Sequence, residues 1–354
     1  MVLSSYESEQ LKKVQAHRDR ELRRSARRLV PEAVQDKGRD YYDKALKMPG
    51  AAKVRDRGAA VLKATAQGTG KFITRTGQLT TSEKRVVRAY AKRGHPVQDV
   101  ADVRKLDLSA VDKVASFTRL HYAYSASAAV EGATAGLIVS GGQILAAGGA
   151  VAGAGAGSAP GLGTIAAAMG VDAGALLTVC SRVIAHDALY YGYDPRDPAE
   201  EVFMMQVIGL GLAATPSAKY VAYQQLSVLT TKLAKNATWH QLNQQALVRV
   251  AQKFAGQFSQ KLTKKKLGQF VPVAGIGIGA ALNWKMVDDV SNAAYWAYRQ
   301  RFLYEKGGEL PPPFVDADLA QPAEDENETA INVIEILESE GIDLEEGDVP
   351  GAAP

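Results

Sequence analysis

A long uncharged segment constrains this chain more than any other feature of its sequence. No charged side chain occurs between Glu131 and Asp172, and residues 132–163 contain 11 Gly and 9 Ala. Such a segment can be a membrane span, a tightly packed helical core or a loop. Its Leu, Ile and Val residues are few, and each favours insertion by only about 0.3–0.6 kcal/mol. Because glycine also weakens a helix by about 1 kcal/mol per residue, the case for a membrane span is marginal.

The spacing of the glycines favours a close-packed helical hairpin over a loop. Small residues four positions apart form a flat strip on one helix face, against which a second helix can pack closely. A Ser-Ala-Pro-Gly break at 158–161 would turn the chain between two helices. We call the strip the glycine seam, and expect a soluble core or a membrane around it. Its members, including two from a second apolar stretch, are Gly132, Gly136, Gly149, Gly153, Gly157, Gly275 and Gly279.

The rest of the chain shows helical patterns separated by polar turns. The two-residue alternation of a β-strand appears nowhere over a useful length. Asp107 or Ser109 is suited to begin one helix, and Asp194 or Asp197 is suited to begin another. The sequence therefore predicts an all-α fold, a compact helical bundle that contains the Gly/Ala-rich hairpin.

The net charge of +4 conceals a strong asymmetry along the chain. Residues 1–120 hold 27 Lys and Arg against 14 Asp and Glu, whereas residues 307–354 hold 14 acids and no Lys or Arg. We therefore expect a basic N-terminal segment (1–49), a helical domain (50–306) and an acidic, mostly disordered tail (307–354). An apolar patch at 331–337 is expected to form a short helix on binding a partner.

Basic residues beside the apolar stretches suggest binding to anionic lipid. The expected helix at 11–28 could lie on an anionic surface, or could be a solvated helix that packs lightly on the body. Lysines before the second apolar stretch would attract anionic lipid by about 1 kcal/mol each. The candidates are Lys12, Lys13, Arg23, Arg24, Arg27, Arg28, Lys261, Lys264, Lys265 and Lys266. Nucleic acid is disfavoured as a partner because the basic N-terminus lacks interleaved aromatic residues.

No catalytic motif is recognisable, so the chain gives no indication of an enzyme, and we expect no metal and no cofactor. Residues 68–72 lack the first glycine of a phosphate loop, and residues 275–279 lack the spacing of a dinucleotide fingerprint. Several polar residues nevertheless accompany the apolar stretches, and buried polar groups need partners. They are Glu131, Asp172, Arg182, His186, Asp187 and Asn283. We expect these residues to meet, either as an internal ion pair such as Asp172 with Arg182 or as a ligand or proton-handling site.

The order of these features resembles the EcsC family of bacterial proteins. The resemblance covers residues 50–306 and includes "EGATAG", "SRVIAHDALYYGYDPRDPAEEVF", "FVPVAGIGIGAALNW" and "AYWAYRQRFL". Its most specific part is the run from Tyr191 to Pro195 with Pro198 and Glu200. The family takes its name from a protein encoded beside the components of an ABC exporter. The resemblance implies a cytosolic or membrane-peripheral helical protein, and it brings no catalytic residues.

These observations lead to one preferred function and two alternatives. We expect a protein peripheral to, or partly inserted in, the inner face of the cell membrane, which binds anionic lipid and has a membrane transporter or another protein as a partner. A single cysteine and an N-terminus without a secretory signal favour the cytoplasm. The first alternative is a soluble enzyme or small-molecule binder that uses the polar residues. The second is a scaffold that recruits a partner through its acidic tail.

Overall fold

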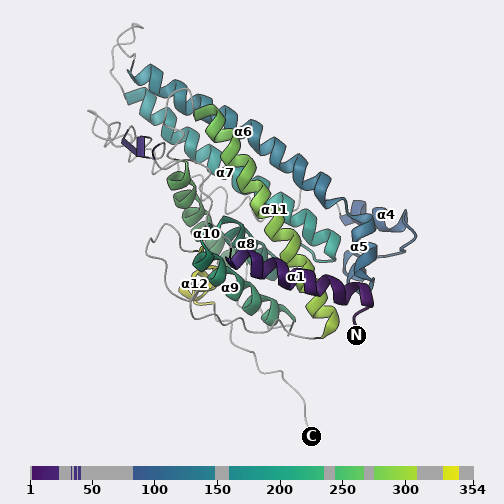
Figure 1. Cartoon of the computed structure of the whole chain (residues 1–354). Helices are drawn as coiled ribbons and strands as arrows, with labels where there is room; N and C mark the ends of the chain where they lie inside the picture. The colour runs from purple at the N-terminus through teal and green to yellow at the C-terminus, as the bar shows by residue number, and fades with distance from the viewer. Residues whose placement is uncertain are drawn as a thin grey trace.

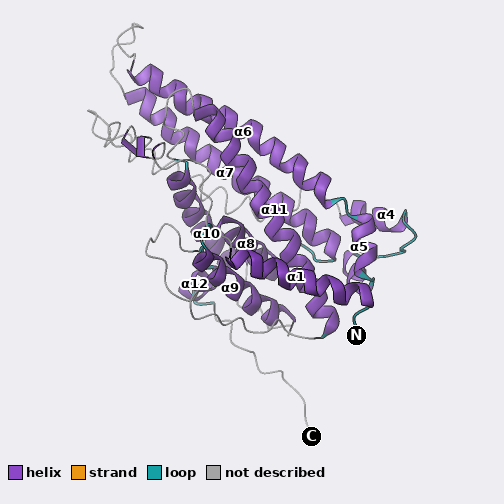
Figure 2. Cartoon of the chain, viewed as in Figure 1, coloured by secondary structure: helices purple, strands orange, loops and turns teal. Residues whose placement is uncertain are grey.

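The fold is built from helices throughout the part of the chain that the structure describes. The computed structural model describes residues 2–23, 83–147, 159–234, 244–266, 275–308 and 330–342, with a few positions between 33 and 40. Within these ranges every regular element is a helix and no strand occurs (Figure 2). The all-α prediction is confirmed.

Three long helices form the main axis of the molecule (Figure 1). They are α6 (Phe117–Ala147), α7 (Ala159–Tyr191) and α11 (Gly275–Gly307). Helices α6 and α7 pack side by side, and α11 packs along both of them. Helix α11 runs antiparallel to α6, since Phe117 contacts Tyr295 while Gly132 contacts Gly279. Residues 275–284 of the second apolar stretch form the first turns of α11, and its earlier residues lie outside the described part.

The glycine seam is visible at Gly132, where α6 meets α11. A Cβ atom at Gly132 would lie 2.7 Å from Cγ of Asn283 and closer still to the carbonyl oxygen of Gly279. The two backbones can approach this closely only because residue 132 has no side chain. Gly136 and Gly275 also belong to these helices, whereas Gly149, Gly153 and Gly157 lie outside the described residues.

A second group of helices packs against α7 and α11. Helix α8 (Pro198–Leu212) is almost entirely buried and packs along α11, where Gly211 meets Val290. Its first turn is capped by Asp197, whose side chain accepts a hydrogen bond from the backbone of Ala199 at 2.9 Å. Helices α9 (Pro216–Ala234) and α10 (Gln244–Lys265) follow and also contact α8.

The N-terminal helix is part of the body. Helix α1 (Ser5–Arg23) packs against α5 (Leu108–Val114), α9 and α11, and buries Val14 and Leu22. It begins earlier than the predicted 11–28 segment and is attached more firmly than a lightly packed helix. Asp107 caps α5, and α4 (Glu83–Ala91) and the 3-10 helix η1 (Val100–Lys105) pack against α7.

The acidic tail contains one described helix, α12 (Val333–Ser339), which packs on α8 and α10. The apolar patch therefore forms the short helix that the sequence predicts, and it does so against its own chain. The other residues beyond Gly308, outside 330–342, lie outside the described part. Among the described residues, no helix combines the length and the apolar composition that crossing a bilayer requires.

Candidate functional site

Three buried polar side chains meet where α7, α11 and the end of α10 come together. Asn283 donates a hydrogen bond from Nδ2 to Oδ1 of Asp172 at 3.0 Å. The ammonium group of Lys266 donates to both Asp172 and Asn283. The exposed fractions are 4% for Asp172, 1% for Lys266 and 0% for Asn283. We call these three residues the polar triad; its charges are paired and hydrogen-bonded, as burial requires.

Two further charged side chains lie within electrostatic range of the polar triad. Glu131 precedes Gly132 on α6 and is half-buried. Burial raises the pKa of Glu131, and so does the nearby Asp172, whereas Lys266 and Arg182 oppose the shift. Burial lowers the pKa of Lys266, and the carboxylate of Asp172 opposes that shift. The region therefore combines two carboxylates with two cations.

The polar triad marks a border along the three long helices. Because Gly132 contacts Asn283, and Asn283 bonds to Asp172, these residues stand at one level of the bundle. Beyond this level the helical segments 132–147, 159–171 and 275–282 contain no charged residue. They extend toward the same end of the molecule (Figure 1). We call these three segments the charge-free end.

The predicted ion pair between Asp172 and Arg182 is wrong, because Asp172 pairs with Lys266. Arg182 is half-buried, and its Nε atom is enclosed without a hydrogen-bond partner among the described residues. The predicted meeting of Asp172 with Asn283 is confirmed.

The other two candidate polar residues form a separate group farther along α7. Nε2 of His121 lies 3.0 Å from both carboxylate oxygens of Asp187, and the hydroxyl of Tyr124 lies 2.7 Å from Nδ1 of His186. At 1.5 Å per residue this group is roughly 20 Å from Asp172 along the helix. Burial raises the pKa of Asp187 to about 6, and burial together with Arg85 lowers the pKa of His186 to about 4.

The candidate lipid-binding residues occupy three different environments. Lys266 does not belong to a surface, because its side chain is enclosed in the polar triad. Lys12, Lys13 and Arg23 are exposed on α1, while Arg24, Arg27 and Arg28 lie outside the described residues. Lys261, Lys264 and Lys265 belong to the end of α10, where Lys265 donates a hydrogen bond to the carbonyl oxygen of Leu212 at 2.7 Å.

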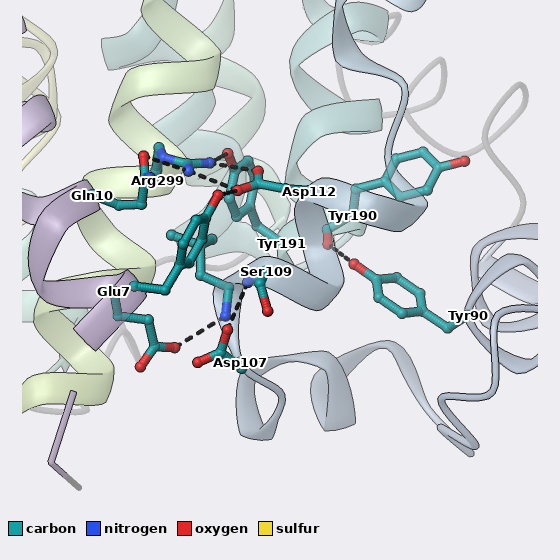
Figure 3. A network of polar contacts seen from close by, with 11 residues as sticks. Glu7, Gln10, Tyr90, Asp107, Ser109, Asp112, Tyr190, Tyr191 and Arg299 are labelled. Carbon is teal, nitrogen blue, oxygen red and sulfur yellow. Dashed lines mark hydrogen bonds and ion pairs between the residues drawn. The ribbon is translucent and has the colours of Figure 1, made fainter. Parts of the chain in front are cut away.

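A second buried network, which the sequence did not indicate, attaches α1 to the body (Figure 3). Arg299 forms two hydrogen bonds of 2.7 Å to the carboxylate of Asp112 and one of 2.9 Å to Gln10. The hydroxyl of Tyr6 donates to the same carboxylate at 2.6 Å. The partners are far apart in the sequence, so no local motif could reveal them.

No group of three or more His, Cys, Asp or Glu residues in the described ranges is arranged to hold a metal ion.

The sequence profile of the EcsC protein family matches residues 8–303. The chain belongs to the EcsC family. The match includes α1 from residue 8 onward, which the resemblance over 50–306 leaves out, and it contains the polar triad and the charge-free end. A relative named "Uncharacterized protein YdbA" from Bacillus subtilis (strain 168) is 26% identical over 239 residues, which cover 67% of this chain and 75% of the relative. No solved structure matches the chain.

Proposed function

We propose that this EcsC-family protein is a peripheral membrane protein whose charge-free end enters one leaflet of an anionic membrane. The observation that carries the proposal is that three helices extend their uncharged segments toward the same end, beyond one level marked by Asp172, Lys266 and Asn283. An α-helix satisfies its backbone hydrogen bonds internally, so helical segments can enter lipid without exposing unpaired polar groups.

The lengths of the segments suit one leaflet. At 1.5 Å per residue, 132–147 extends about 24 Å and 159–171 about 20 Å beyond the border. The hydrocarbon core of a bilayer is about 30 Å thick, so either segment is long enough to enter one leaflet and too short to cross both. Close packing at Gly132 is also suited to lipid, where helices associate through small residues rather than through the hydrophobic effect.

Basic and aromatic side chains beside the border suit a membrane surface. Lys261, Lys264 and Lys265 belong to the end of α10, directly before the buried Lys266. Each lysine near an anionic surface contributes about 1 kcal/mol of attraction. Trp284 directly follows Asn283, and its ring contacts the exposed ring of Tyr122 edge-on, with the ring centroids 5.2 Å apart. Trp and Tyr rings favour the membrane interface. We extend the proposal to the cytoplasmic face of the cell membrane, with a transport system as a partner.

Sedimentation of the full chain with vesicles tests this function. We expect binding to vesicles that contain phosphatidylglycerol, little binding to phosphatidylcholine alone, and a part of the binding that persists at high salt. Ile138→Asp, within the charge-free end, should weaken binding at least tenfold, because a buried charge costs about 2.5–3.5 kcal/mol. Val130→Asp is the matched control on the body side of the border, since Val130 is 70% exposed. Binding that is absent in the wild type, or equal in all three proteins, would contradict the proposal.

Replacing pairs of lysines by uncharged glutamine then tests which face of the protein contacts the lipid. Lys261→Gln with Lys264→Gln should weaken vesicle binding by about 2 kcal/mol in total, roughly 30-fold, because both lysines lie near the border. Lys12→Gln with Lys13→Gln removes the same charge from α1, and should have a smaller effect. An equal or larger loss in the α1 variant would mean that the membrane contacts a different face of the protein.

A further inference from the structure

The acidic segment 330–342 occupies a surface formed by α8 and α10. Its apolar side chains are almost fully buried there, although they belong to a tail that is otherwise rich in acids. The buried residues are Ile331, Val333, Ile336, Leu337 and Ile342. Their spacing around α12 gives the segment one apolar face and one acidic face, the pattern of a helix that binds in a groove.

The surface is shaped to receive the backbone of this segment. A Cβ atom at Gly209 of α8 would lie 3.1 Å from the carbonyl oxygen of Ile331. That distance is shorter than most Cβ contacts in proteins, so a side chain at residue 209 would push the backbone of Ile331 away by a few tenths of an ångström. The surface therefore fits the backbone of this segment as well as its apolar side chains.

Charges on α10 complement the acidic face of α12. Nε of Arg249 donates to the carboxylate of Glu340 at 2.6 Å, and Nζ of Lys253 lies 2.5 Å from the same carboxylate. Lys253 also donates to Oγ of Ser339 at 3.0 Å. The basic residues come from the body and the acidic residue comes from the tail, so the surface selects an acidic helix.

Three observations distinguish α12 from the domain on which it packs, although its apolar side chains are part of the hydrophobic core. The family match ends at residue 303, so the surface belongs to the family domain and α12 does not. A helix as short as Val333–Ser339 is not stable in isolation, so it depends on the surface for its structure. An open pocket of about 360 Å³ remains between the two helices, lined by Lys253, Gly256, Gln257, Gln260, Glu335, Ile336 and Ser339.

We propose that the α8–α10 surface is a binding site for an acidic amphipathic helix, and that residues 330–342 are its resident, exchangeable ligand. Tethering gives the segment a high effective concentration, which keeps the site occupied even if the intrinsic affinity is modest. Release would uncover Arg249 and Lys253 together with the apolar surface between α8 and α10.

Binding of a labelled peptide of residues 330–342 tests the proposal in solution, without lipid, so its outcome is independent of the proposed membrane function. The acceptor is the full chain with Ile336→Asp and Leu337→Asp, which removes the resident helix from the site. We expect fluorescence anisotropy to show at least tenfold tighter binding to this variant than to the wild type. A peptide with the same two substitutions is the control and should bind neither protein. No binding to a variant that keeps its circular dichroism spectrum would overturn the proposal.

A charge exchange and a measurement on the wild type complete the test. Adding Arg249→Glu and Lys253→Glu to the acceptor should weaken its binding of the native peptide. A peptide with Glu340→Lys should bind this acceptor more tightly than the native peptide does, which recovers part of the lost affinity. In the unmodified chain, amide hydrogens of α12 should exchange at least tenfold faster than those of α8. Equal protection of α12 and α8 would show that the segment opens only with the whole domain, and would overturn the proposal even if the acceptor variant failed to fold.

Discussion

The two ends of helix α11 are stabilised in different ways. Toward its C-terminus, Arg299 pairs with Asp112, and Arg301 donates to Glu200 at 2.7 Å and to Glu305 at 2.7 Å. Toward its N-terminus, residues 275–282 carry no charge, and Gly279 closely approaches Gly132 of α6. Ion pairs with Asp112 and Glu200 therefore connect α11 to distant segments in the body, whereas a close approach between Gly132 and Gly279 joins α11 to α6 at the start of the charge-free end.

The two kinds of contact differ in how strongly they depend on their surroundings. A buried ion pair with well-placed partners fixes relative positions, because separating its charges in the interior is costly. Packing between glycines has no such requirement and works equally in a protein core and in lipid. The polar triad lies at the level where the body ends and the charge-free end begins.

The largest predicted effect on stability comes from removing the ion pair of the polar triad. Lys266→Met should lower the free energy of unfolding by about 3–5 kcal/mol, because Asp172 then remains as a buried and unpaired carboxylate. Lys266→Met combined with Asp172→Asn should recover most of this loss, since the double variant leaves no buried charge. Urea unfolding of the three proteins at one pH measures both differences. A double variant as unstable as the single one would mean that the triad stabilises through packing rather than through its charges.

The body also contains a buried carboxyl group that forms no ion pair with the described residues. Glu201 on α8 is 4% exposed, and one of its carboxylate oxygens has no hydrogen-bond partner among the described residues. Burial, with a smaller contribution from Asp197, raises its pKa from 4.5 to about 8. The folded state therefore keeps this proton over a pH range in which the unfolded state has lost it.

The sign of the resulting pH dependence can be tested with Glu201→Gln. Below about pH 4.5 both states of the wild type hold the proton, so the substitution should have little effect. Between pH 4.5 and 8 the wild type loses up to about 1.4 kcal/mol per pH unit, because its unfolded state gains from ionisation. At pH 7 the variant should be more stable than the wild type by up to about 3 kcal/mol. Urea unfolding at pH 4.5 and 7 checks this, and a difference that does not grow with pH would contradict it.

The sequence predicted the helices and two of the three residues of the polar triad, for identifiable reasons. Helix caps such as Asp107 and Asp197 are local signals, so they were recognisable without tertiary information. Asp172 and Asn283 were recognisable because polar residues beside uncharged stretches need a partner. Lys266 was misinterpreted as a surface residue because it follows two lysines in the sequence. In the structure, the side chain of Lys266 at the end of α10 instead lies buried against Asp172 and Asn283.

The contacts that hold α1 and α12 were beyond sequence reasoning. Arg299 and Gln10 are bonded across almost the whole length of the chain, so periodicity and spacing carry no information about them. The apolar patch of the tail indicated a short helix but not its binding surface, because that surface depends on Gly209 and on charges from α10. Contacts between residues this far apart in the sequence can be identified only once the fold is known.

The smallest of these effects concerns the packing at the charge-free end. Gly132→Ala would force a Cβ atom against the backbone of Gly279 and the side chain of Asn283, which should destabilise the protein by about 1–3 kcal/mol. Gly256→Ala is the matched control within helix α10, where a Cβ atom would meet nothing within 4 Å. It should stabilise the protein by about 0.5–1 kcal/mol, because alanine favours a helix interior over glycine. Urea unfolding measures both changes, and equal signs for the two variants would mean that helix propensity, rather than the close approach of α6 and α11, decides the stability of this end.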